Sequence, residues 1–189
     1  MKENTLKNTV FSKNVIEFTT VALQYCNFIE NFEGEDSDMF IDKMTKILPL
    51  LYLKVVLVEE TEPVNDEEPE TTVTESDYNY VLSKLYNILG KNDTYLEVFL
   101  QDMKYSETPI AASVSEDLSD IYQDLKNFIT IYERGIIENM NDALFVCIEN
   151  FKAYWGQKLV NVMRALHILK YAEPDGDSLE EIEDNTDIW

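Results

Sequence analysis

The feature that most limits the fold is residues 141–171, which contain no proline and are apolar on more than one face. Apolar residues step by four and three there, as on one face of an α-helix. A second apolar set covers much of the remaining circumference, which a surface helix would not need. We therefore predict one central helix, roughly 45 Å long. The main stripe is Leu144, Ile148, Phe151, Trp155, Leu159, Val162, Leu166 and Leu169, and the second set is Phe145, Val146, Ala153, Val160, Met163 and Ile168.

Four more segments have the apolar period of helices: residues 9–32, 37–58, 77–89 and 115–132. A Ser-x-x-Glu capping signal at Ser113 favours the start of the last one. Gly34, Gly90 and Gly135 mark the ends of helices, and Pro49 predicts a kink. Residues 91–114 are expected to be an ordered loop with one short helix or extended piece. The predicted fold is all-α, a single-domain bundle of about five main helices packed around the long C-terminal helix.

The net charge of −22 is concentrated in two segments. Residues 59–77 hold nine acids and no base, and residues 173–189 hold eight acids and no base. We predict an all-helical domain over residues 1–172, with a solvated acidic loop at 59–76 and a disordered acidic tail at 173–189. Because no basic cluster is present, direct binding to nucleic acid or to an anionic membrane is disfavoured.

The remaining composition favours a cytoplasmic protein without a disulfide framework. Cys26 and Cys147 lie within apolar stripes, where free thiols behave as small hydrophobes. The N-terminal sequence is polar and does not resemble a signal peptide. In the tail, Leu179, Ile182, Ile188 and Trp189 among acids are typical of a segment that docks on a partner, although a solvated tail is the simpler interpretation. A protein partner is expected, and the sequence leaves the oligomeric state open.

Three acids and two basic side chains form the candidate polar cluster: Asp117, Asp120, Asp124, Arg164 and His167. The acids share one helical edge, and an antiparallel turn at Gly135 is expected to place them beside Arg164 and His167, with Asp120 or Asp124 paired to Arg164. One interpretation is a structural ion-pair network. The alternative is a pocket in which an Asp orients His167 as a base, or several carboxylates bind a divalent cation.

Several sequence blocks resemble an uncharacterised bacterial family, domain of unknown function 5063. The blocks are residues 120–125 (Asp-Ile-Tyr-Gln-Asp-Leu), residues 155–160 (Trp-Gly-Gln-Lys-Leu-Val) continuing into 164–167, and, more weakly, residues 48–53. The sequence departs from the family pattern at Lys158, where a histidine is frequent, which weakens a metal site based on several histidines. The resemblance implies an all-helical fold and a bacterial source, and it implies no activity.

The sequence contains no complete catalytic set. His167 is the single histidine, and we find no nucleophile elbow, glycine-rich phosphate loop or dinucleotide fingerprint. No catalytic residue, metal ligand or cofactor is therefore assigned. Gly156 is expected to allow close approach of another helix. We predict a non-catalytic interaction or regulatory module, and the alternative is a metal-dependent or hydrolytic enzyme that uses the polar cluster.

Overall fold

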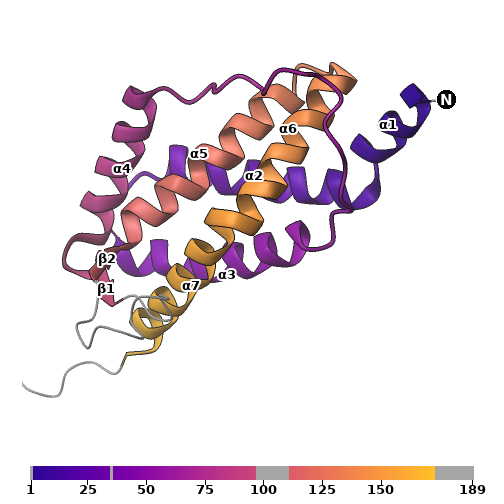
Figure 1. Ribbon diagram of the computed structural model, residues 1–189. Helices are drawn as coiled ribbons and strands as arrows, with labels where there is room; N and C mark the ends of the chain where they lie inside the picture. The colour runs from indigo at the N-terminus through magenta and orange to yellow at the C-terminus, as the bar shows by residue number, and fades with distance from the viewer. Residues whose placement is uncertain (1, 35, 97–110, 173–189) are drawn as a thin grey trace, which may run out of the picture.

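The computed structural model describes residues 2–34, 36–96 and 111–172, and most of them are helical (Figure 1). α6, a π-helical segment and α7 are continuous and form a rod of 35 residues, which we call the C-terminal rod. The all-α prediction with a long C-terminal helix is confirmed. In chain order the elements are α1 (Lys2–Val10), α2 (Lys13–Asn31), α3 (Ser37–Val55), α4 (Glu75–Leu89), a 3₁₀ turn (Gly90–Asn92), β1 (Thr94–Leu96), β2 (Ala111–Ser113), α5 (Val114–Tyr132), α6 (Ile137–Asn150), the π segment (Phe151–Trp155) and α7 (Gly156–Tyr171).

The N-terminal region forms two helices where the apolar pattern predicts one. Ser12 caps α2, and its side chain accepts a hydrogen bond of 3.4 Å from the backbone N–H of Val15. A serine cap favours a fresh helix start, so Phe11 falls in the break and is 46% exposed. The prediction of one continuous helix over residues 9–32 is therefore wrong at its start.

α5 shares the central position with the C-terminal rod. It packs against α2, α4, α6 and α7, whereas α7 packs mainly against α3 and α5 (Figure 1). Val160 and Ile168 of α7 are 38% and 55% exposed. The predicted burial of a second apolar face on the rod is thus wrong at these positions, because no described element covers the outer side of α7 there.

Aromatic side chains link α2 and α5 in the core. The rings of Phe18 and Phe128 stack with centroids 5.4 Å apart. The buried Tyr25 hydroxyl donates a hydrogen bond of 2.8 Å to the backbone oxygen of Leu118. Because this polar group is satisfied, the tyrosine can be buried at little cost.

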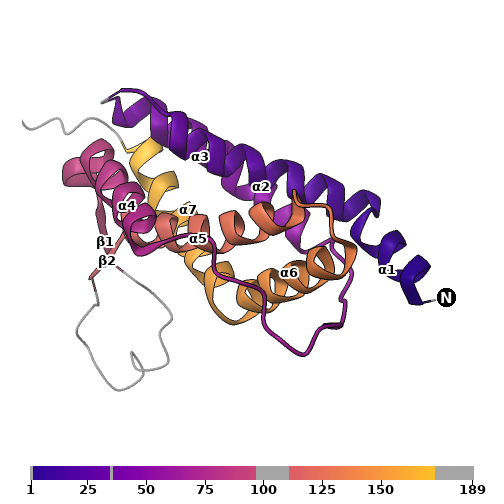
Figure 2. The same cartoon turned by 90° about the horizontal axis from the view of Figure 1, so that it is seen from above.

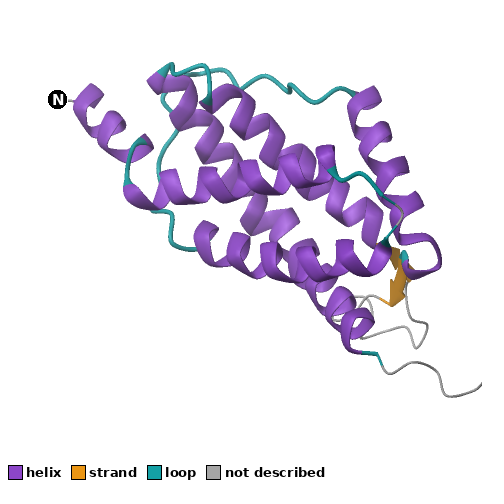
Figure 3. Ribbon diagram, turned by 180° about the vertical axis from the view of Figure 1, so that it is seen from behind, coloured by secondary structure: helices purple, strands orange, loops and turns teal. Residues whose placement is uncertain are grey.

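The acidic segment between α3 and α4 is anchored to the bundle (Figure 3). We call residues 59–74 the acidic strap. Asp142 accepts hydrogen bonds from the backbone N–H groups of Val64 and Asn65 at 2.8 and 2.9 Å. Asn127 accepts from the backbone of Val73 at 2.8 Å, and Val73 is buried. The strap lacks helix and strand, and most of its side chains are exposed. Acceptors on α5 and α6 hold several of its backbone donors, so it follows a defined path over the bundle.

The region after α4 contains a short pair of strands. β1 and β2 are antiparallel, with Thr94 opposite Ser113, so the predicted ordered loop with an extended piece is confirmed for its described parts. The predicted tail at residues 173–189 lies outside the described residues. Among the helices of the described residues, none has both the length and the apolar composition that crossing a membrane requires.

Candidate functional site

The three predicted acids of α5 all contact the C-terminal rod. Asp117 bonds Lys158 at 2.6 Å, Asp120 accepts from the Tyr154 hydroxyl at 2.6 Å, and Asp124 accepts from the Asn150 side chain at 2.5 Å. The acids step by three and four along α5, and their partners step by four along the rod, as expected for two antiparallel helices in register. We call these six residues the acid ladder.

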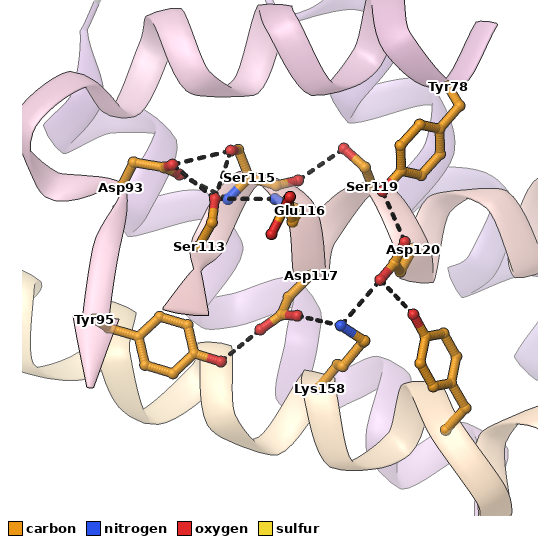
Figure 4. A network of polar contacts seen from close by, with 11 residues as sticks. Tyr78, Asp93, Tyr95, Ser113, Ser115, Glu116, Asp117, Ser119, Asp120 and Lys158 are labelled. Atoms are coloured by element: carbon orange, nitrogen blue, oxygen red, sulfur yellow. Dashed lines mark hydrogen bonds and ion pairs between the residues drawn. The ribbon is translucent and has the colours of Figure 1, made fainter. Parts of the chain in front are cut away.

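Lys158 lies at the centre of the densest part of this ladder (Figure 4). Its ammonium group is 2.6 Å from Asp117 and 2.9 Å from Asp120. The side chains of Asp117, Asp120 and Lys158 are only 7%, 14% and 25% exposed. Tyrosine hydroxyls complete the cluster: Tyr95 donates to Asp117 at 2.5 Å and Tyr78 donates to Asp120 at 2.8 Å. One ammonium group therefore balances one of the two negative charges, and tyrosine hydroxyl donors stabilise the carboxylates further.

These contacts leave no free base or nucleophile in the cluster. Burial alone would lower the pKa of Lys158, but hydrogen bonds to Asp117 and Asp120 outweigh it and raise that pKa. Burial, followed by the hydrogen bond to Asp120, raises the pKa of Tyr78. At neutral pH the amine stays protonated and the phenol stays neutral. Within the described residues, no group of three or more His, Cys, Asp or Glu side chains is arranged to hold a metal ion.

The predicted basic partners, Arg164 and His167, do not join the acids. Both side chains are exposed. Among the ion pairs between described residues, none links Arg164 to an acid of α5, and the His167 ring instead lies 4.8 Å from that of Tyr171. The predicted pair of Asp120 or Asp124 with Arg164 is therefore wrong.

The error has a geometric cause. α5 is shorter than the rod, so the start of α5 cannot lie opposite the end of the rod. Helices joined by a short turn meet at equal distances from that turn. Asp117 and Asp120 lie 18 and 15 residues before Gly135, so equal counting places them opposite residues 153 and 150, and Arg164 lies past the beginning of α5. The count therefore excludes Arg164, but it ends five residues short of Lys158 and four short of Tyr154. Tyr78 and Tyr95 come from other elements, and no local pattern indicates them.

The start of α5 is fixed by a polar anchor next to the ladder (Figure 4). Ser113 caps the helix by accepting from the backbone of Glu116 at 3.3 Å, as the capping signal predicts. Asp93, which is 5% exposed, accepts from the Ser115 backbone at 2.7 Å and from the Ser113 hydroxyl at 2.7 Å. The strand pair and the first turn of α5 are thereby joined, which brings Tyr95 toward Asp117.

The π segment and Gly156 shape the other side of the ladder. The backbone N–H of Gly156 bonds the oxygen of Phe151, five residues earlier, as in a π-helix. A Cβ at Gly156 would lie 2.4 Å from that oxygen and 2.8 Å from the Phe151 ring. The close approach predicted at this glycine is therefore real, but it comes from the preceding turn of the same rod and not from another helix. Trp155, fully buried, donates to the oxygen of Cys147 at 3.1 Å.

Two hollows lie away from the ladder. One, of about 570 Å³, lies between the acidic strap and α5–α6, with Arg134 and Asp142 in its wall. The other, of about 300 Å³, lies between β1 and α7, with Arg164 and Ile168 in its wall. Among their described lining residues, neither hollow has a His, Cys or Ser that would serve as a nucleophile or base.

A different candidate site is the outward face of α3. This helix buries one face, yet Leu50 and Leu53 on the opposite face are 40% and 52% exposed, and Leu57, in the turn that follows the helix, is 46% exposed. Val56 beside them is 48% exposed. α2 and α3 together form one side of the bundle (Figure 2), and the exposed fractions show that solvent reaches these side chains. Grouped apolar residues on a surface are a common mark of a binding site.

The fold and site define a small helical domain with a satisfied polar cluster and an apolar surface. The model of the family "Domain of unknown function (DUF5063)" matches residues 9–172. The chain therefore belongs to this family, as the sequence blocks indicate. It is similar to the crystal structure of protein BF1032 from Bacteroides fragilis, with 47% sequence identity and a TM-score of 0.79, over 88% of this chain and 98% of that one. A comparison with curated proteins gives no match.

Proposed function

We propose that this chain is a non-catalytic, cytoplasmic protein-interaction module whose binding surface is the outward face of α3. The observation that carries the proposal is the group of four exposed apolar side chains at the C-terminal end of that helix, Leu50, Leu53, Val56 and Leu57. Removing such a group from water on binding is favourable, at about 25 cal/mol per Å² of apolar area. Interfaces of this kind depend on a small central apolar cluster.

The acid ladder supports the non-catalytic part of this proposal. Its acids are already bonded to Lys158, Tyr154 and Asn150. A catalytic acid or base must have a proton acceptor or donor site open to substrate. The ladder is therefore better suited to fixing the register of α5 against the rod than to chemistry.

Affinity capture from an extract of the source cells tests the proposal. The wild type is compared with Leu53→Lys and with Ile168→Lys as the matched control. Leu53 and Ile168 are 52% and 55% exposed, and both lie on long helices. The expected result is a set of proteins retained by the wild type and the control and lost with Leu53→Lys. Capture that is identical with all three proteins would reject α3 as the binding surface.

A metal-dependent or hydrolytic enzyme is the second candidate function. One observation favours it: the π segment lies directly beside Asp120 and Lys158, and π segments are frequent at functional sites. A site for Mg²⁺, Mn²⁺ or Ca²⁺ in the native state would raise the melting temperature in proportion to occupancy. The proposal expects no rise with any of these ions, and a rise that Asp120→Asn abolishes would favour the enzyme.

A further inference from the structure

We infer that a third hollow, beside Asp124 of the acid ladder, binds a small primary alkylamine in its protonated form, with the Asp124 carboxylate holding the ammonium group. This Asp124 hollow has a volume of about 430 Å³ and lies between the acidic strap, α5 and α6. None of its lining residues belongs to α3, so the inference does not depend on the proposed function. Three observations carry it: a carboxylate without a cationic partner, a lining without a base, and a cover that is anchored on both sides.

Asp124 is the acid of the ladder that has no cationic partner among the described residues. Asp117 and Asp120 share Lys158, whereas the side-chain partner of Asp124 is the Asn150 amide, at 2.5 Å. Burial raises the pKa of Asp124, the hydrogen bond from Asn150 lowers it, and the charge of Asp120 raises it further. A carboxylate that is partly removed from water beside another acid is stabilised by a nearby cation. A bound ammonium group would supply that cation.

The charge of the lining favours a cationic ligand. Among the described lining residues there are four acids and no lysine or arginine, and the acids are Glu68, Glu70, Asp124 and Glu149. Arg134 pairs with Glu70, and Lys152 pairs with Glu149. The other two acids form no ion pair within the described part of the chain. The hollow is therefore negative, which attracts a cation and repels an anion.

Apolar side chains in the same lining favour an organic cation over a metal ion. Phe145 and Val146 of α6 and Pro69 of the strap line the hollow and are half-buried. Calcium and magnesium sites use several oxygen ligands, and no group of three or more His, Cys, Asp or Glu in the described residues is arranged to hold a metal ion. An alkylammonium ion needs one carboxylate for its charge and an apolar wall for its chain.

The acidic strap covers one side of the hollow with residues 68–71. Asp142 anchors the strap before this cover, at residues 64 and 65. Asn127 anchors it after the cover, at residues 72 and 73. A hollow whose cover is held at both ends keeps its shape without a ligand, so that binding has to order few groups.

Titration of the full chain with n-butylammonium chloride, followed by two-dimensional NMR, tests the inference. The backbone amide signal of Val146 and the side-chain amide signal of Asn150 should shift and saturate. A Kd of about 1 mM is expected for a ligand of so few atoms. n-Butanol has a similar shape and no charge, and it should bind at least about tenfold more weakly, since a hydrogen bond to a charged group is lost.

Two variants separate the charge from the space. Asp124→Asn keeps the size of the side chain and should bind n-butylammonium at least about tenfold more weakly. It should fold, because the ionised form of Asp124 destabilises the native state. Asp38→Asn is the matched control, with the same loss of charge at an exposed position on α3, and it should bind as the wild type does. Val146→Phe keeps Asp124 and should weaken binding by filling the hollow.

Three results would overturn the inference: a wild type without saturable shifts at the hollow, n-butanol that binds as tightly as the amine, or unchanged binding by Asp124→Asn. Nα-acetyl-lysine methylamide carries the same ammonium group on a peptide unit. If it bound more tightly than n-butylammonium, the hollow would accept a lysine of another protein, which would overturn a small amine as the ligand. All of these outcomes leave the proposed function of α3 unaffected.

Discussion

Lys158 holds together two carboxylates that lie one helical turn apart. Asp117 and Asp120 are both largely buried and both within 3 Å of its ammonium group. Without the lysine, two like charges would face each other in a site of low exposure, where their repulsion is poorly screened. The cluster therefore stabilises the packing of α5 on α7 as long as the lysine remains charged.

Replacing Lys158 with Met should destabilise the fold by about 2 kcal/mol. This is below the 3 to 5 kcal/mol typical of a broken buried pair, because a quarter of the lysine side chain is exposed. Arg164→Met is the matched control, since Arg164 is exposed and should cost under about 0.5 kcal/mol. Urea unfolding of both variants measures the difference, and equal costs would contradict the structural role of Lys158.

Ionisation of Asp124 should lower the free energy of unfolding as the pH rises. Burial raises its pKa, against the lowering effect of the hydrogen bond from Asn150. A folded-state pKa above the unfolded value, about 3.9, means that ionisation destabilises the fold at neutral pH, and this loss disappears as the pH falls below about 3.9. Asp124→Asn should therefore be more stable than the wild type at pH 7, with the advantage shrinking in acid.

Ionisation of Asp77 should have the opposite effect and raise the free energy of unfolding. The hydrogen bonds from Thr74 lower its pKa, so its stabilising effect is present above the ordinary Asp pKa and is lost as the pH falls through the lowered value. Asp77→Asn should be less stable than the wild type at pH 7 and approach it in acid. Unfolding free energies across a pH series check both variants, and curves of the same sign would contradict these pKa directions.

At the scale of elements, the π segment sets the shape of the C-terminal rod. Its extra residue lets Trp155 point into the core while Tyr154 and Lys158 keep the register of the ladder. Phe151 occupies the space that a side chain at Gly156 would need. The glycine and the π segment are therefore one structural unit.

Gly156→Ala should destabilise the protein by roughly 2 kcal/mol, the usual cost of forcing an extra methyl group into a packed site. In an ordinary helix the same change stabilises by about 1 kcal/mol, so the sign of the effect is the diagnostic result. Thermal or urea unfolding measures it. A stabilised variant would mean that the π segment is not maintained.

The acidic strap is a second element whose attachment is polar. Asp142 is 2% exposed and accepts from the strap at Val64 and Asn65, and Asn127 holds the strap separately at Thr72 and Val73. Each anchor satisfies backbone groups that no regular element satisfies.

Asp142→Ala should therefore release only one end of the strap. Hydrogen exchange at the amides of Val64 and Asn65 should become much faster, while the amides of Thr72 and Val73 remain protected by Asn127. The overall cost should be about 2 kcal/mol, as for a lost set of hydrogen bonds to a charged group. Equal acceleration at both ends would show that the strap opens as one unit.

Over the whole molecule, the sequence predicts the features that depend on residues close together in the chain, above all the positions of the helices. Apolar period and end signals such as Ser113, Gly90 and Gly135 identify the five long helices, because they act within a few residues. The partner of the acids depends on the lengths of two helices and their connection, so the pattern predicts Arg164 where the structure has Lys158. Tyr78 and Tyr95 reach the ladder from separate elements, and such contacts have no periodic signal.

We propose that the outward face of α3 is where this chain meets another protein. Methyl NMR spectra of the chain with labelled leucine and isoleucine, recorded with and without the proteins that the wild type captures, test this surface. On their addition the methyl signals of Leu50, Leu53 and Leu57 should shift together, while those of the exposed Ile168 and the buried Leu166 stay fixed. Fixed signals on α3, or shifts centred on Ile168, would contradict the claim.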